Sequence, residues 1–256
     1  MPNITFIIMF ASWQRAVAIL TKRQRVATLF KSNCICTVSF PVILTISLTL
    51  AFADETYLEQ DFTPSNDIVD FVFLGNLGIA QNLLSVLHAI ERIKDIPSFK
   101  VHFVGDGSML EEMKRYVTEH GLEDKVFFYG RRPVDEMPFY YKLADACLVS
   151  LKADNATGLT LPSKVQGYMA AGKPIIGMID GSAKDVIEQS GCGICVSAGD
   201  EEGLAAALER FIRDKDGYRD CGRKARQYFV ENFSKKSFME QLEKEIERVG
   251  KENVKF

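Results

Sequence analysis

The residues best suited to chemistry lie in "TLPSKVQGYMAAGKPIIG", residues 160–177. Ser163 followed three positions later by Gln166 matches a capping box, which predicts a helix that begins at Lys164. A helix N-terminus carries unpaired N–H groups and the positive end of the helix dipole, and Lys164 adds a cation there. Two interpretations follow: a helix start that binds an anion, or a well-capped helix with an exposed lysine.

Other reactive residue types form no such group. The three histidines are dispersed without metal-ligand spacing, so the sequence predicts no metal site. Of the six cysteines, Cys192 and Cys195 form a C-x-x-C pair within "SGCGICVSAG", a short apolar run flanked by glycines. No helix start lies beside them to favour a thiolate, so we interpret them as buried strand cysteines.

Short apolar runs alternate with amphipathic stretches through most of the chain. "DFVFLG" (70–75) is followed by helical spacing over about 80–93, and the unit recurs after "KVHFVGDG", "KVFFYG", "ACLVSL", "PIIGMI" and "GICVSA". Runs this apolar are typical of strands covered on both faces. Six strand-helix units therefore predict an α/β fold with a doubly wound, Rossmann-like parallel sheet. Helices at 201–213, about 215–231 and 235–249 are expected to close the chain.

The loops after the predicted strands are rich in glycine. In an open α/β sheet, ligands bind outside the carboxyl ends of the strands. The loops there contain "FLGNLG", "VGDGS", "YGRR" and "DNATGLTLPSK". Gly75 and Gly78 lack the third glycine of the dinucleotide fingerprint and its downstream acidic residue, which argues against a dehydrogenase.

Residues 1–53 differ in composition from the rest of the chain. They contain five basic side chains and no acidic one, and residues 34–53 form an uncharged, largely apolar run that ends in Ala-Phe-Ala. This pattern admits three interpretations: a membrane anchor, a cleaved signal peptide, or foreign or mistranslated sequence in front of the folded domain. The long stretch before the apolar run and the proline inside it argue against the signal peptide.

The order and spacing of these motifs resemble the C-terminal, donor-binding half of a family 4 glycosyltransferase with the GT-B fold, over roughly residues 69–245. The resemblance rests on "FVFLGNLG", on "VHFVGDGSMLEEMKRYVTEHGLEDKVFFYGRRPVDEMPFYYKLADACLVSL" and on "LPSKVQGYMAAGKPII". It is strongest to the branch with P-S-K before the donor helix, found in transferases that build bacterial capsule and O-antigen polysaccharides from nucleotide-activated sugars.

The resemblance implies a site for a nucleotide sugar, expected to be UDP-linked, and implies no cofactor and no metal. The loop glycines would lie against the phosphates and line the cleft, and the backbone of residues 129–131 would frame the base. Ser163 and Lys164 would meet the diphosphate. The expected donor-binding residues are Gly75, Asn76, Gly78, Gln81, Gly105, Asp106, Gly107, Tyr129, Gly130, Arg131, Thr160, Ser163, Lys164 and Gln166.

Three positions depart from the family's pattern. Asn76 and Gln81 stand where the family has an arginine and a lysine that bind phosphate, and Gly167 stands where it has a glutamate for the ribose hydroxyls. Each missing cation removes charge-assisted contacts of about 1.5–3 kcal/mol. We expect Lys164 to replace part of the lost phosphate charge. Gln166 offers an amide beside the missing glutamate.

The resemblance also implies where the domains of the chain begin and end. Family members have a second α/β lobe that supplies the acceptor pocket and a catalytic histidine, and residues 1–68 are too few to form it. We therefore expect a basic and apolar N-terminal segment (1–53), an interdomain linker (54–68) and a nucleotide-sugar-binding domain (69–256). Such a chain would be truncated, and would bind a donor weakly without transferring the sugar.

The expected reaction is metal-independent transfer of a sugar to a lipid-linked or polysaccharide acceptor at the cytoplasmic face of the membrane. Loop N–H groups and Lys164 would stabilise the leaving diphosphate. The expected partners are the nucleotide sugar, the acceptor and a separate N-terminal lobe, without nucleic acid. Two alternatives remain at this stage. A sugar-nucleotide 2-epimerase would need catalytic acids and histidines that the loops lack, and a non-catalytic module would dock the lobe of another chain.

Overall fold

The computed structural model describes residues 68–153 and 161–234, followed by residues 236, 237, 239–241, 243 and 244. The N-terminal segment 1–53, the linker up to residue 67, Thr160 and most of the predicted helix 235–249 lie outside the described residues.

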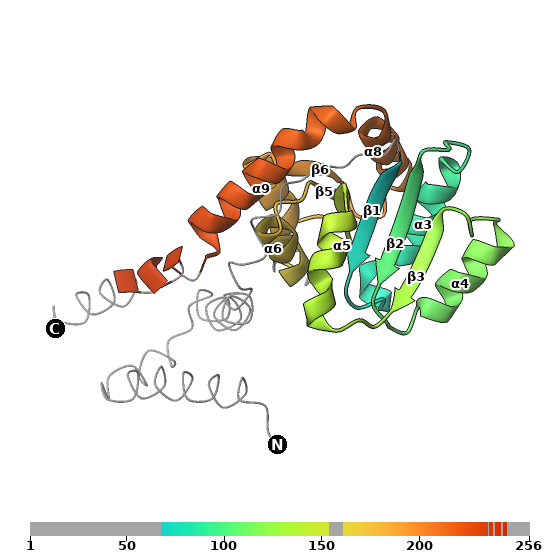
Figure 1. Cartoon of the computed structure of the whole chain (residues 1–256), viewed down its shortest axis with the longest axis horizontal. Helices are drawn as coiled ribbons and strands as arrows, with labels where there is room; N and C mark the ends of the chain where they lie inside the picture. Colours follow the sequence, from blue (N-terminus) through green and yellow to red (C-terminus); the bar gives the residue numbers. More distant parts are fainter. Residues whose placement is uncertain (1–67, 154–160, 235, 238, 242, 245–256) are drawn as a thin grey trace, which may run out of the picture. The chain divides into compact units, whose positions relative to one another are not determined.

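A single parallel sheet forms the centre of the described domain (Figure 1). Its six strands have the order β3-β2-β1-β4-β5-β6, and every neighbouring pair is parallel. This is the doubly wound, Rossmann-like order, so the fold class predicted from the apolar runs is confirmed. The strands are β1 (Val69–Leu74), β2 (Phe99–Val104), β3 (Val126–Gly130), β4 (Ala146–Ser150), β5 (Ile175–Met178) and β6 (Gly193–Val196).

Helices cover both faces of the sheet, as the apolar strands require. One apolar cluster joins the sheet to α3 (Leu83–Arg92), α4 (Leu110–Glu119) and α8 (Glu201–Arg213). The other joins it to α5 (Met137–Leu143), α6 (Ser163–Ala170), α7 (Ser182–Ser190) and α9 (Arg219–Asn232). Short 3-10 turns complete the described chain: η3 (Ile79–Gln81), η4 (Val134–Glu136) and η6 (Lys215–Tyr218).

Strand β1 shows how the sequence builds both layers. All six of its residues are buried, and alternate side chains enter opposite clusters. Phe71 and Phe73 face α3 and α8, with the rings of Phe71 and Phe211 centred 5.7 Å apart. Val72 and Leu74 face α5 and α6. A strand buried on both sides therefore reads as a continuous apolar run.

The helix predicted over about 80–93 is interrupted near its start. Residues 79–81 form the 3-10 turn η3, and α3 begins only at Leu83. Asn82 between them has φ 49° and ψ 42°, in the left-handed region that asparagine enters more readily than most residues. The break leaves the side chain of Gln81 in contact with Lys164 instead of on a helix surface.

The chain reverses its winding between β1 and β4, which are neighbours in the sheet. They pair at Phe71–Ala146 and Val72–Cys147 and then separate. Beyond this point the amide of Leu74 donates a hydrogen bond to the hydroxyl of buried Tyr168, at 3.0 Å. That bond holds α6 against the end of β1, at the crevice where this class of sheet binds its ligands.

Tyr168→Phe is expected to lower the free energy of unfolding by about 1–3 kcal/mol, because it leaves the buried amide of Leu74 without a partner. Urea unfolding followed by circular dichroism measures the change. Tyr228→Phe is the matched control, since among the described contacts its hydroxyl makes no recorded hydrogen bond. Equal losses in the two variants would contradict the proposed anchoring role of Tyr168.

Candidate functional site

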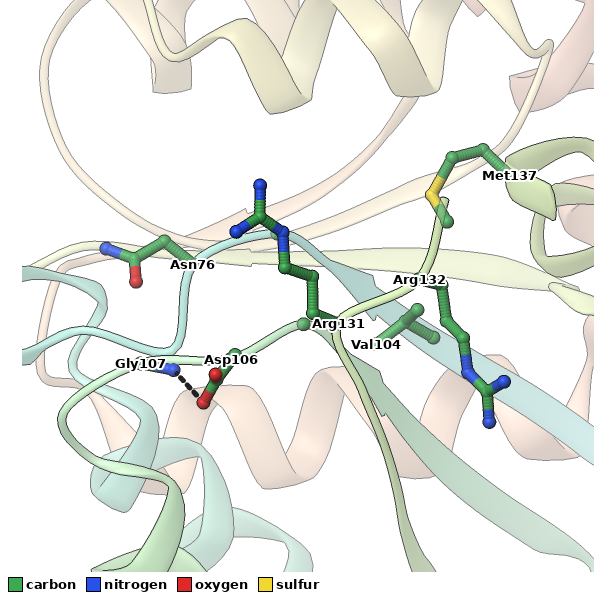
Figure 2. Close-up of a pocket in the computed structure, with 9 residues that line it drawn as sticks. Asn76, Val104, Asp106, Gly107, Arg131, Arg132 and Met137 are labelled. Atoms are coloured by element: carbon green, nitrogen blue, oxygen red, sulfur yellow. Dashed lines mark hydrogen bonds between the residues drawn. The ribbon is translucent and has the colours of Figure 1, made fainter. Parts of the chain in front are cut away.

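An open cleft of about 550 Å³ lies beyond the carboxyl ends of the strands (Figure 2). The loops after β1, β2 and β3 form it, as expected for an open α/β sheet. The sequence-predicted residues Gly75, Asn76, Gly105, Asp106, Gly107 and Arg131 come together there. Val104, Arg132 and Met137 complete the lining.

Backbone hydrogen bonds hold the three loops together. The amide of Gly75 donates to the carbonyl of Val104 at 2.8 Å, and the amide of Gly105 donates to the carbonyl of Gly130 at 2.9 Å. Gly105 has φ 150°, and a Cβ there would lie 1.8 Å from the carbonyl oxygen of Gly75. Only glycine permits this approach, so a structural role of these glycines is to let the loops pack closely together.

The cleft carries two cations and one carboxylate. Arg131 and Arg132 are exposed at its rim, and their side chains leave the backbone in opposite directions (Figure 2). The Nε–H of Arg132 donates to the carbonyl of Tyr129 at 3.1 Å. Asp106 accepts a hydrogen bond from the amide of Gly107 at 2.7 Å, so part of its charge is already engaged. The resulting excess of positive charge favours an anionic ligand.

Lys164 approaches the loop after β1 from α6, which packs on the layer of the sheet opposite to α3. Its Nζ donates to Oε1 of Gln81 at 2.6 Å and lies 4.7 Å from the ring centroid of Phe73. A Cβ on Gly75 would lie 2.9 Å from Cε of Lys164. The side chain can occupy this place because residue 75 is a glycine, and the ammonium therefore lies directly behind the backbone that lines the cleft.

The ammonium of Lys164 is partly desolvated, and within residues 68–153 and 161–234 it has no carboxylate beside it. Burial lowers the pKa of Lys164 to about 8. The described ion pairs include none that involves Lys164. A neutral amide and an aromatic face compensate a buried cation less well than an anion does. An anion bound in front of Gly75 would supply the missing counter-charge.

The predicted capping box is wrong. The residue that caps α6 is Pro162, with φ −61° and ψ 137°, and no side chain caps the helix by a hydrogen bond. Ser163 is already the first helical residue and is exposed, so its hydroxyl does not occupy the capping position. Gln166 is buried, and its Oε1 has no recorded partner in the described part of the chain. The helix begins one residue earlier than predicted because the extended backbone of Pro162 suits the cap position.

The other predicted residues lie at the edge of the cleft or outside the described chain. A Cβ on Gly78 would lie 2.7 Å from Nδ2 of Asn76, so this glycine lets the loop fold back on itself. Tyr129 and Gly130 form the end of β3 beneath the arginines. A Cβ on Gly167 would lie 3.1 Å from the hydroxyl of Tyr141, so that hydroxyl borders the space next to this glycine. Thr160 lies outside the described residues.

Three lining residues were missed by the sequence reasoning. Val104 ends β2 immediately before Gly105, and Arg132 follows the predicted Arg131. Met137 begins α5 after a short 3-10 turn. The first two are sequence neighbours of predicted positions, so extending each predicted loop by one residue would have included them. Nothing in the sequence around Met137 indicated that it reaches back over the cleft.

Within the described residues, no group of three His, Cys, Asp or Glu side chains is placed to hold a metal ion. No helix in the described part of the chain is long and apolar enough to cross a membrane.

The doubly wound sheet and the glycine-lined cleft at its strand ends can be compared with known protein families. Residues 57–228 match the family of glycosyl transferases group 1, and the chain belongs to that family. The resemblance inferred from the loop motifs is thereby confirmed, including its GT-B fold.

The alignments with individual relatives cover only part of each relative's length. The chain is 32% identical over 144 residues to the probable glycosyltransferase WbjE of Pseudomonas aeruginosa, covering 54% of this chain and 34% of that protein. It is 26% identical over 168 residues to the putative colanic acid biosynthesis glycosyl transferase WcaI of Escherichia coli K12, covering 64% and 40%. The chain thus spans well under half the length of these two relatives.

Among solved structures, the domain is similar to Anabaena Alr3699/HepE in complex with UDP, with a TM-score of 0.65 and 18% identity. The match covers 76% of this chain and 55% of that one. At this level of identity, the likeness establishes the fold.

The charge of Lys164 makes a prediction about pH. The cation is lost as pH rises through about 8, so the affinity for UDP should fall by about tenfold between pH 7.5 and pH 9.5, since a bound diphosphate favours the charged form. Isothermal titration calorimetry at the two pH values measures this. Lys164→Gln should bind UDP weakly and equally at both; the same decline in that variant would assign the pH effect to another group.

Proposed function

We propose that this domain binds the diphosphate of a nucleotide sugar and serves as the donor site of a glycosyltransferase. The acceptor would be lipid-linked or a growing polysaccharide, in the biosynthesis of a cell-surface polysaccharide such as capsule or O-antigen. The observation that carries the proposal is the ammonium of Lys164 behind Gly75, at the crevice where the sheet reverses its winding, with no carboxylate partner among the described residues.

The geometry of the cleft supports a diphosphate. Glycines at residues 75, 105 and 107 carry no side chain at the ends of adjacent strands, so a ligand can approach the backbone closely. Lys164 lies behind Gly75 on one side of the cleft, and Arg131 and Arg132 line the other side together with the carboxylate of Asp106. Charged hydrogen bonds to phosphate are about twice as strong as neutral ones, so a few such donors suffice for orientation.

The family relatives support the rest of the proposal. The structure of HepE was solved in complex with UDP, which favours a uridine diphosphate sugar as the donor here. WcaI is named for colanic acid biosynthesis, which favours a polysaccharide product. We further propose that the reaction takes place at the cytoplasmic face of the membrane, as the resemblance to the family implies.

The proposed reaction gives roles to Lys164 and to its partner Gln81. As the bond between the sugar and the diphosphate breaks, negative charge grows on the leaving phosphate. In this proposal Lys164 stabilises that charge, and interactions that strengthen in the transition state accelerate the step. Gln81 holds the ammonium in place through its side-chain oxygen. The acceptor would be bound by a second lobe, which is not among the described residues.

Lys164→Gln should weaken the binding of UDP at pH 7.5 by at least tenfold, because one charge-assisted contact of about 1.5–3 kcal/mol is lost. Calorimetry with the full chain measures this. Lys94→Gln is the matched control: it removes the same charge from an exposed position just after α3, and should bind UDP like the wild type. Failure of the wild type to bind any nucleoside diphosphate would overturn the donor site.

Transfer itself is tested by incubating the full chain with UDP-sugars and a membrane extract containing lipid-linked acceptors, and following the release of UDP. We expect release only when a separately produced acceptor lobe of a family member is added. Transfer by this chain alone would contradict the proposed need for another lobe, and would leave the donor site intact.

A further inference from the structure

A buried chain of polar side chains crosses the sheet beneath α5 and ends at the rim of the cleft. Tyr129 on β3, His102 on β2 and Asp70 on β1 belong to three adjacent strands. The hydroxyl of Tyr129 lies 2.9 Å from Nδ1 of His102, and Nε2 of His102 lies 2.9 Å from Oδ1 of Asp70. No step of the proposed transfer uses these groups.

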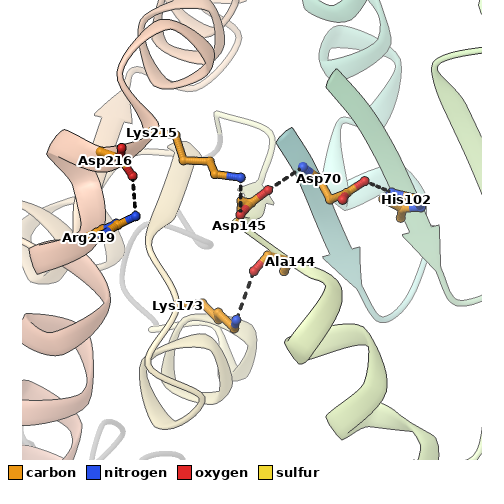
Figure 3. A network of polar contacts seen from close by, with 8 residues as sticks. All are labelled: Asp70, His102, Ala144, Asp145, Lys173, Lys215, Asp216 and Arg219. Atoms are coloured by element: carbon orange, nitrogen blue, oxygen red, sulfur yellow. Dashed lines mark hydrogen bonds and ion pairs between the residues drawn. The ribbon is translucent and has the colours of Figure 1, made fainter. Parts of the chain in front are cut away.

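The chain continues across the next strand, as Figure 3 shows. The amide of Asp70 donates to Oδ2 of Asp145 at 2.9 Å, and Lys215 lies 3.0 Å from the other oxygen of Asp145. Both carboxylates are buried. A buried carboxylate requires compensating donors: Asp70 has His102, and Asp145 has the amide of Asp70 and Lys215.

The contacts of His102 fix the orientation of its ring. Because the partner at Nε2 is a carboxylate, Nε2 carries a proton and donates to Asp70. When the ring is neutral, Nδ1 accepts a hydrogen bond from the hydroxyl of Tyr129. The ring also stacks on Phe127, with centroids 5.5 Å apart. His102 therefore presents Nδ1 to the hydroxyl of Tyr129 at a fixed position.

Tyr129 occupies an irregular position at the edge of the sheet. The register of β2 and β3 shifts so that Phe103 pairs with Phe128 and Val104 pairs with Gly130, which leaves Tyr129 as an extra residue. Such a bulge disrupts the ladder locally and redirects the strand. The hydrogen bond to His102 and the edge-on contact with Tyr140, at 5.3 Å, hold the bulged residue instead.

The position of Tyr129 determines the rim of the cleft. Its carbonyl accepts the hydrogen bond of Arg132, and the carbonyl of the next residue, Gly130, accepts that of Gly105. Arg131 and Arg132 follow directly and line the cleft. A displaced Tyr129 would therefore move the arginines on one side and the loop after β2 on the other.

We propose that His102, held by Asp70, is a positioning residue that fixes Tyr129 and thereby the arginine rim against which the nucleoside part of the ligand lies. This inference rests on the proposed nucleotide-sugar site. The diphosphate is assigned to the opposite side of the cleft, near Gly75 and Lys164. The network should consequently affect the nucleoside more than the phosphates.

Two probes separate these contributions, UDP and inorganic diphosphate, each titrated into the full chain. Tyr129→Phe should weaken UDP about fivefold, the effect of one lost net hydrogen bond, and leave inorganic diphosphate within about twofold of the wild type. Lys164→Gln should weaken both probes. Tyr116→Phe is the matched control, because it deletes a hydroxyl bonded to Glu91 between α3 and α4, and should change neither affinity.

A second variant tests the link to His102. His102→Gln retains a donor for Asp70 but lacks the fixed ring, and should weaken UDP like Tyr129→Phe. The variant with both changes should bind UDP as weakly as the more affected of the two single variants, and no more weakly. Both changes interrupt the same series of hydrogen bonds, so their effects should not add.

The outcomes are distinguishable. Wild-type affinity for UDP in Tyr129→Phe, or equal weakening of both probes, would overturn the positioning role while the donor site stands. Additive losses in the double variant would overturn the link between His102 and Tyr129. A wild type that binds neither probe would overturn the proposed function together with this inference.

Discussion

The ammonium of Lys164 lies against Gly75 because α6 is fixed to the end of β1. The fixing bond is the one from the amide of Leu74 to the hydroxyl of Tyr168, one helical turn after Lys164. It forms at the place where β1 and β4 have separated, so it replaces a ladder contact that the sheet no longer provides. Without this anchor, the lysine would be an exposed residue near a helix start.

The location of this cation places a positive charge beside the loop after β1, which has no basic side chain of its own. Asn76 and Gln81 are neutral, yet the side chain of Gln81 accepts a hydrogen bond from Lys164. The positive charge is therefore delivered from the opposite layer of the sheet, to within one hydrogen bond of residue 81. A glycine at position 75 makes this route possible, because any side chain there would meet Lys164.

The sequence predicted the architecture well, since strands buried on both faces leave an unmistakable apolar pattern, as in β1. It also located the cleft, because strand ends and glycines are visible in the chain. The prediction from sequence failed at helix ends, whose positions depend on a few backbone angles. Whether Ser163 or Pro162 caps α6 depends on local geometry, and the left-handed conformation of Asn82 split a helix that apolar spacing predicted as continuous. The contacts of Lys164 and His102 depend on residues more than 25 positions away, which no local pattern encodes.

The most direct test of the account is a crystal structure of the full chain grown with UDP at pH 7.5. We expect Nζ of Lys164 to lie within about 2.7–3.2 Å of a diphosphate oxygen in front of Gly75, with the uracil on the side of Arg131. A diphosphate bound elsewhere, with Lys164 still bonded only to Gln81, would contradict the central claim.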